Sequence, residues 1–301
     1  MKNYKSFIEF AQDFSTREQC LLHLCELKWG DGFECRKCGH NVAVKGRTWY
    51  YRKCQKCHRD ESCTAHTLFH KLKFSVVKAF WITYQIGTMK KGMSTSEIAR
   101  QYEIHQETAW YFKRKIQQAM TASENTLLSG SVEVDEMVIG GMEPGKPGRS
   151  HGKKKLIQVA VEIDYPSDPD QKVVMKRAGA VTISDASSAS LKTAIDSMID
   201  PDCAITTDQW SAYPQAIGDR IHLTFPSDDG ANFPHLHWHN FNIKNWLRGI
   251  HHHISSKHAQ SYLNEYHYRF NRRNYIRSNP THLLLSMVKE PWLPYKMAVG
   301  T

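Results

Sequence analysis

Two Cys-x-x-Cys pairs near the start of the chain constrain its fold more than any other feature. The first pair is Cys35 and Cys38, the second is Cys54 and Cys57, and fifteen residues separate the two pairs. Each pair can place two thiolates on one tight turn, and this spacing is typical of a four-cysteine structural zinc site. Four unliganded thiols in an exposed segment would oxidise readily, so that alternative is poor. The sequence therefore predicts one structural Zn²⁺ in an N-terminal helix and zinc ribbon over residues 1–70.

The balance of charge indicates the kind of partner. Lys and Arg total 40 against 30 Asp and Glu, which gives a formal net charge of +10. A basic protein of this kind favours an acidic partner, most commonly nucleic acid, because Lys and Arg contact phosphates. No run of residues approaches the roughly 20 apolar residues of a membrane span, and the start of the chain lacks the apolar region of a signal peptide. We therefore expect a cytoplasmic protein with no membrane partner.

Residues 71–125 are predicted to form a helix-turn-helix DNA-binding domain. Ser94 and Glu97 have the spacing of a capping box at the start of one helix, and a second helix with several basic residues begins after a three-residue turn. In domains of this kind the second helix enters the major groove. A helical hairpin used only for packing or dimerisation is the alternative. The residues expected to face DNA are Gln106, Thr108 and Lys113, with Arg114 as a further DNA-binding candidate.

The pattern of residues 126–235 predicts an α/β domain. Val132 and Val134 alternate with acidic residues, so Asp135 lies on the strand face opposite the two valines. A second acid, Asp208, ends a short apolar run. Periodicity alone indicates only a mixed α/β fold. Further strands are expected at 156–163, 177–183 and 204–207, with an amphipathic helix at 187–199.

Two other segments are basic enough to contact a DNA backbone. A loop rich in Gly and Pro at residues 143–155 carries five Lys or Arg, and an irregular hairpin tip without DNA contacts is the alternative. Residues 244–273 carry six Lys or Arg against one acid. The DNA-binding candidates in these segments are Lys153, Lys154, Lys244, Arg248 and Arg272.

Together these motifs resemble the bacterial insertion-sequence transposases of the DDE type that carry an N-terminal zinc ribbon and an ISXO2-like transposase domain. Besides the cysteine pairs, the resemblance is carried by Val132-Glu-Val-Asp-Glu136 with Gly140-Gly141, Thr207-Asp208-x-Trp210, Asn242-x-Lys-x-Trp-Leu-x-Gly249 and Tyr262-Leu-Asn-Glu-x-x-x-Arg-Phe-Asn-Arg-Arg273. It implies an RNase H-like catalytic core over residues 126–280, preceded by the zinc ribbon and the helix-turn-helix domain and followed by a C-terminal tail at 281–301. In such a core the first and fourth strands are neighbours.

The resemblance also implies the chemistry of the site. Asp135 and Asp208 take the places of the first two catalytic acids. The third position departs from the glutamate of most DDE enzymes, and here it is Asn242, with Asn240 as the alternative. Two Mg²⁺ or Mn²⁺ ions held by these residues would activate a water or a DNA 3′-hydroxyl and stabilise charge on the scissile phosphate.

The implied function is a DNA transposase that cleaves and joins DNA strands. Its partners would be the ends of its element and a target DNA, and we expect a homodimer or larger assembly on DNA, in the bacterial cytoplasm and associated with the nucleoid. One alternative is a DNA-binding regulator whose α/β core is inactive. A second is an RNase H-like nuclease that cuts DNA without joining it.

Overall fold

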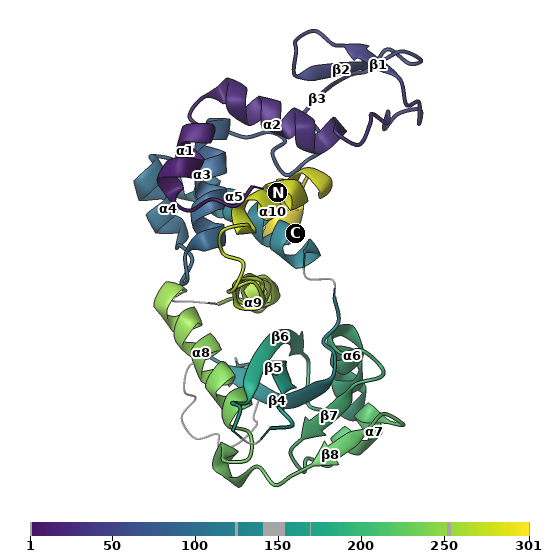
Figure 1. Ribbon diagram of the computed structural model, residues 1–301, viewed down its shortest axis with the longest axis vertical. Coiled ribbons are helices and arrows are strands. Elements are labelled where there is room, and N and C mark those ends of the chain that lie inside the picture. The colour runs from purple at the N-terminus through teal and green to yellow at the C-terminus, as the bar shows by residue number, and fades with distance from the viewer. Residues whose placement is uncertain (1, 124–125, 141–153, 169, 252–253, 301) are drawn as a thin grey trace. The chain divides into compact units, whose positions relative to one another are not determined.

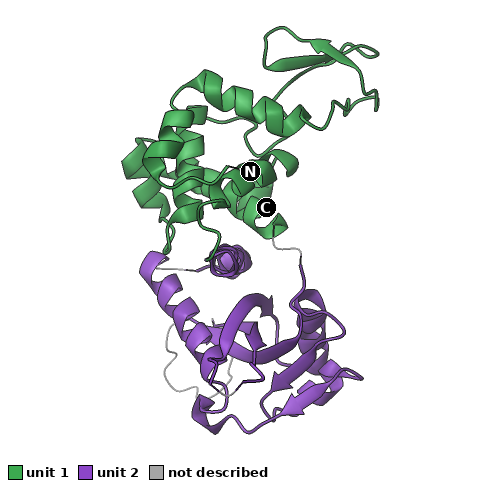
Figure 2. Cartoon of the chain, in the orientation of Figure 1, with its two compact units in different colours: residues 1–123, 274–301 green, residues 124–273 purple. Residues whose placement is uncertain are grey.

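The computed structural model describes residues 2–123, 126–140, 154–168, 170–251 and 254–300. The chain divides into two compact units (Figures 1 and 2). Unit 1 combines Met1–Ser123 with Asn274–Thr301, and unit 2 is Glu124–Arg273. Both chain ends therefore belong to unit 1, and unit 2 is inserted between them. Within the ranges above, no helix is both long and apolar enough to cross a membrane.

Unit 1 is mainly helical. The two helices predicted around the short turn are present as α4 and α5, and Ser94 Oγ caps α4 by accepting a bond from the Glu97 amide at 3.1 Å. The Glu97 carboxylate accepts a bond from Arg100 at 2.6 Å on the surface of the same helix. The helices of this unit are α1 (Phe7–Asp13), α2 (Arg17–Trp29), α3 (Val76–Thr88), α4 (Thr95–Tyr102), α5 (Gln106–Ala122), α10 (Asn279–Lys289) and α11 (Tyr295–Val299).

The C-terminal segment differs from the predicted tail, because it forms two helices that complete unit 1. Leu283 of α10 packs so closely on Gly87 of α3 that a Cβ there would meet its side chain at 2.9 Å. The Met287 carbonyl accepts a bond from the Leu68 amide at 2.9 Å. Leu283, Leu284 and Met287 are fully buried, at helical spacing. This apolar stripe explains why the segment folds back onto the N-terminal helices.

The ribbon of unit 1 is a small antiparallel sheet with the order β1-β2-β3. Its strands are β1 (Ala43–Lys45), β2 (Tyr51–Cys54) and β3 (Asp60–Ser62). A buried ion pair between Lys28 and Glu61, with a nitrogen–oxygen distance of 2.6 Å, attaches the ribbon to helix α2. Lys28 also donates to the carbonyls of Ser62 and Ala65, at 2.9 and 2.7 Å. The ribbon is therefore held by its neighbouring helix as well as by any metal.

Unit 2 contains a five-stranded mixed sheet with the order β6-β5-β4-β7-β8. The first three strands are antiparallel, whereas β4 pairs with β7, and β7 with β8, in parallel. The predicted neighbouring of the first and fourth strands is thus confirmed, and the arrangement is consistent with an RNase H-like core. The elements are β4 (Ser131–Ile139), β5 (Lys155–Asp164), β6 (Val174–Ile183), α6 (Ser188–Met198), β7 (Ala204–Thr207), α7 (Tyr213–Ile217), β8 (His222–Thr224), the 3₁₀ turn η1 (Asp228–Gly230), α8 (Pro234–Ile250) and α9 (Ser256–Asn271).

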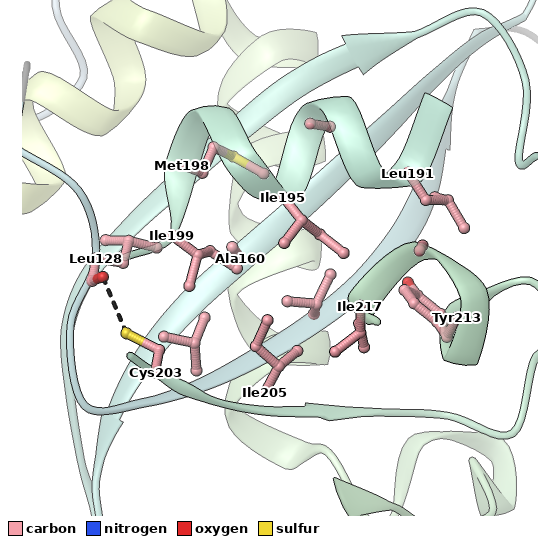
Figure 3. Packing of buried hydrophobic residues seen from close by; sticks show 14 residues of the cluster. Leu128, Ala160, Leu191, Ile195, Met198, Ile199, Cys203, Ile205, Tyr213 and Ile217 are labelled. Carbon is pink, nitrogen blue, oxygen red and sulfur yellow. Dashed lines mark hydrogen bonds between the residues drawn. The ribbon is translucent and has the colours of Figure 1, made fainter. Parts of the chain in front are cut away.

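The two faces of this sheet carry separate cores. Val132 and Val134 of β4 point into one core together with α6 and α7, and Figure 3 shows this cluster, where the Cys203 thiol donates to the Leu128 carbonyl at 3.2 Å. Met137 of the same strand points into the other core, which α8 and α9 cover. Because side chains alternate along a strand, Asp135 shares a face with Met137. The candidate acid therefore faces α8, as its separation from the valines predicts.

Candidate active site

Asp135 and Asp208 come from neighbouring parallel strands. Strands β4 and β7 pair in parallel as far as Glu133 opposite Thr206, and Asp208 directly follows the end of β7. Extending this register by two residues would set Asp135 opposite Asp208. Aligned residues on adjacent strands point to the same face of a sheet. On that alignment both acids would lie on the face covered by α8, with Asp135 in the middle of β4 and Asp208 directly after the end of β7.

Tyr213, a buried residue of the core on the opposite face of the sheet, lies near these acids. Burial raises the pKa of Tyr213 well above its usual value, and the negative charges of Glu136, Asp135 and Asp208 raise it further. Charges act on one another mainly within about 10 Å at ordinary salt. The charges of Glu136, Asp135 and Asp208 therefore all reach Tyr213. The Asp208 carboxylate is also fixed locally, since its Oδ1 accepts a bond from the Trp210 amide at 3.0 Å.

Helix α8 brings Asn240 to the acid pair. The helix begins at Pro234, which occupies its first turn, and Leu236, Asn240 and Ile243 form part of its buried face. Asn240 Nδ2 donates to Asp135 Oδ2 at 3.4 Å. The side chain of Asn240 is buried, and among the described residues its Oδ1 has no hydrogen-bond partner. A buried amide oxygen of this kind is costly unless something else satisfies it.

Asn242 lies elsewhere on the same helix. Two residues along an α-helix correspond to a rotation of about 200°, so Asn242 and Asn240 leave the helix in nearly opposite directions. Asn242 is half-buried. Asn240 is the asparagine for which the structure gives a contact with Asp135.

His237, on the same helix, also lies close to Asp135. Its Nε2 lies 3.8 Å from Asp135 Oδ2, and its side chain is 42 % exposed. It precedes Asn240 by three residues, so the two side chains lie one above the other on the helix. The signal in the sequence is the His-x-x-Asn spacing, which carries meaning only once the helix is known to start at Pro234.

Glu133 has a hydrogen-bond partner that is not part of the acid pair. It is buried, and burial raises the pKa of its carboxyl group, while its bond from the Tyr165 hydroxyl opposes that shift. The Tyr165 Oη to Glu133 Oε1 distance is 2.5 Å. Glu133 therefore has a partner of its own two residues before Asp135.

The four predicted zinc ligands form one cluster in the ribbon. The sulfur atoms of Cys35, Cys38, Cys54 and Cys57 all lie within 4.8 Å of one another. Backbone amides of the first turn, chiefly that of Lys37, lower the pKa of the Cys35 thiol to about 6. Four sulfurs at this separation, with amide support for a thiolate, fit a tetrahedral structural zinc site.

The lysines of helix α5 require a correction to the expected DNA-facing set. Its sequence predicts that Lys113 faces the groove, but this residue is buried and its Nζ donates to the Met93 carbonyl at 2.7 Å. Lys115, two residues later, is also buried and donates to the His70 carbonyl at 2.8 Å. Both ammonium groups thus bind backbone oxygens inside unit 1. These two lysines therefore do not add positive charge to the surface of α5.

The other DNA-binding candidates lie at or near the surface. Gln106 is exposed at the start of α5, and Thr108 is half-buried one residue after Glu107. Arg114 donates to Gln117 Oε1 at 2.8 Å on the same helix. In unit 2, Arg248 is exposed, whereas three others are half-buried: Lys154, Lys244 and Arg272. Lys153 and most of the predicted basic loop lie outside the described residues.

The comparison with protein families agrees with the division of the chain. Residues 127–271 match a family model described as an ISXO2-like transposase domain. This range nearly coincides with unit 2, Glu124–Arg273, and it includes Asp135, Asp208 and both candidate asparagines. No curated protein matches the chain.

Proposed function

We propose that the chain is a DNA transposase that cleaves the ends of its element and joins them to a target, because residues 127–271 match the model of the ISXO2-like transposase domain. The observation that carries the proposal is the parallel pairing of β4 with β7, because extending its register would set Asp135 opposite Asp208. Carboxylates paired across adjacent strands suit divalent-metal chemistry on phosphates.

The donor set at this place fits a hard divalent cation. Asp135 and Asp208 supply carboxylate oxygens. The buried Oδ1 of Asn240 has no hydrogen-bond partner among the residues that the structure describes, so this oxygen is available to a metal ion. Turning the Asn240 amide by half a rotation would bring this oxygen to the side of Asp135. Oxygen ligands are those that Mg²⁺ and Mn²⁺ prefer. The residues that would hold the metal are therefore Asp135, Asp208 and Asn240, with Asn242 as the alternative third ligand.

A bound Mg²⁺ or Mn²⁺ would supply an activated water or 3′-hydroxyl and would offset the charge that develops on the scissile phosphate. The protein's own contribution is position. The Trp210 amide donates to the Asp208 carboxylate, and without metal Asn240 Nδ2 donates to that of Asp135. Helix α8 packs on this face of the sheet through the buried side chains of Leu236 and Ile243.

An asparagine in place of the usual glutamate removes one negative charge from the site. A site with two carboxylates and one amide attracts a second cation less strongly than a site with three carboxylates. DNA phosphates would then complete the metal coordination when the substrate binds. The proposal thus includes metal binding that is strengthened by DNA.

Unit 1 would supply much of the DNA binding. Helices α4 and α5 are joined by the three residues 103–105, an arrangement that suits a helix-turn-helix with α5 against the major groove. Gln106 and Thr108 at the start of α5 are the contacts proposed there. The ribbon adds basic side chains around its cysteines, and transposition of two ends implies a dimer or larger assembly on DNA.

A strand-transfer assay tests the proposal. Purified protein is mixed with Mg²⁺, a labelled linear DNA carrying the terminal repeats that flank the gene, and a supercoiled target. We expect cleavage at the repeat boundary and covalent joining to the target. Cleavage without joining would indicate a nuclease, and repeat binding without cleavage would indicate a regulator; each result would overturn the proposal.

A further inference from the structure

His237 and Asn240 converge on the same oxygen atom. His237 Nε2 lies 3.8 Å from Asp135 Oδ2, and Asn240 Nδ2 lies 3.4 Å from that oxygen. Residues three apart on a helix lie on one side, one turn apart. An imidazole nitrogen and an amide therefore face one carboxylate oxygen from consecutive turns of α8.

Gly230 packs closely against the imidazole ring of His237, on its Nδ1 side. Gly230, in the turn before α8, has a φ of +93°. A Cβ at this position would lie 2.4 Å from His237 Nδ1 and 2.6 Å from its Cε1. Only glycine allows the backbone to approach the ring this closely, and only glycine adopts this backbone conformation without strain. The backbone occupies the Nδ1 side of the ring, which leaves Nε2 toward Asp135.

His237 Nε2 and Asp135 Oδ2 are close enough for an ion pair when the imidazole is protonated. The 3.8 Å separation of His237 Nε2 and Asp135 Oδ2 is longer than a hydrogen bond. Two donors that share one ion at about 2.1 Å lie at most about 4.2 Å apart. The observed distance is therefore short enough for both atoms to bind the same cation, with small adjustments of the side chains.

We propose that His237 is a nitrogen ligand of the divalent metal at Asp135 and Asn240. This inference rests on the proposed function, which places a metal beside Asp135. An imidazole donor would replace part of the binding that is lost with the missing glutamate. Mg²⁺ takes oxygen ligands, whereas transition metals accept imidazole. The site therefore binds a transition-metal dication such as Mn²⁺ more tightly than it binds Mg²⁺.

Mn²⁺ is the probe, because its electron spin resonance reports both affinity and ligand type. Full-length protein with zinc in its ribbon is titrated with Mn²⁺, and spin-echo modulation is recorded on the bound ion. We expect ¹⁴N coupling in the wild type and loss of that coupling in His237→Ala, with Mn²⁺ affinity reduced about tenfold or more. His235→Ala, on the same helix, is the matched control and keeps the coupling.

A second variant tests the position of the ring. Gly230→Ala leaves His237 in the sequence but pushes its imidazole, so the ¹⁴N coupling should weaken while the coupling remains in the His235→Ala control. Circular dichroism of each variant checks that the fold is retained. Unchanged coupling in Gly230→Ala would contradict the role given to the glycine in placing the ring.

The possible outcomes distinguish the ligand role of His237 from the proposed transposase function. Bound Mn²⁺ that depends on Asp135 but shows no ¹⁴N coupling would overturn the role of His237 and leave the transposase proposal standing. Retention of both coupling and affinity in His237→Ala would have the same consequence. A wild type whose Mn²⁺ binding is unchanged by Asp135→Ala would contradict the proposed metal site itself, and the role of His237 with it.

Discussion

Asn240 Nδ2 lies 3.4 Å from Asp135 Oδ2, which joins the middle of helix α8 to the first acid-bearing strand. Asn242 leaves the same helix in nearly the opposite direction. The two candidates for the third position of the site therefore lie on nearly opposite sides of α8. The structure supports Asn240, whereas the motif carried by the resemblance begins at Asn242.

Paired alanine variants decide between these asparagines. We expect Asn240→Ala to lower the rate of Mg²⁺-dependent cleavage by about tenfold to a hundredfold, because a buried amide beside Asp135 is removed. Asn242→Ala should keep a rate within about twofold of the wild type. Single-turnover cleavage of end DNA is the measurement. A larger loss of cleavage rate in Asn242→Ala than in Asn240→Ala would instead assign the third position to Asn242.

Removing zinc should unfold the ribbon. Structural zinc sites contribute on the order of 10 kcal/mol of apparent binding free energy, and Cys54 is fully buried among the other sulfurs. Cys54→Ser should lose the bound zinc, as measured by mass spectrometry of the native protein, and should expose the ribbon to protease. Cys203→Ala, in the other unit, serves as the control with one zinc retained. Full zinc content in Cys54→Ser would refute the cluster as the binding site.

On helix α5, the buried Lys113 is expected to stabilise the fold, whereas the exposed Gln106 is expected to contact DNA. Lys113→Ala removes a buried ammonium that satisfies the Met93 carbonyl, so unfolding free energy should fall by about 1–3 kcal/mol. Gln106→Ala should instead weaken binding to end DNA and leave the melting temperature unchanged, because Gln106 is exposed. Thermal melts and DNA titrations of both variants are compared. A stable Lys113→Ala protein with selectively weakened DNA binding would reverse the assignment.

Lys115 should give unit 1 a measurable pH dependence. Burial lowers the pKa of its ammonium from 10.5 to about 8. Between these two pH values the unfolded chain keeps a proton that the folded protein has released, so the contribution of Lys115 to stability rises with pH. Thermal melts at increasing pH should show this rise in the wild type and in Lys90→Met, whose native side chain is exposed. The rise should be absent in Lys115→Met, and its persistence there would contradict the assignment.

Much of the fold could be predicted from local pattern, whereas the pairing of the two acids is implied by the resemblance. The alternation around Val132 and Val134 predicts Asp135 on the opposite face, and the end of an apolar run predicts Asp208 at a strand terminus. The strands and the helix expected between residues 156 and 207 are present as β5, β6, α6 and β7. These features depend on neighbours in sequence, which is the information that periodicity contains.

The remaining features depend on contacts between distant segments. Lys113 has the side chain of a DNA-binding residue, but a carbonyl twenty residues away takes its ammonium. The contact of Asn240 with Asp135 depends on where α8 starts and which side of the helix meets the sheet. His237 acquires its place through Gly230, whose role is visible only when the turn packs on the ring. None of these contacts has a signature in the local sequence.

The paired-acid site is tested most directly by Mg²⁺-dependent cleavage of end DNA by Asp135→Ala and Asp208→Ala, with DNA affinity measured in parallel. We predict that each variant loses detectable cleavage while its DNA affinity stays within about twofold of the wild type, since each removes a side chain at the metal and not a contact to the DNA backbone. Cleavage at a near wild-type rate in either variant would contradict the paired-acid site.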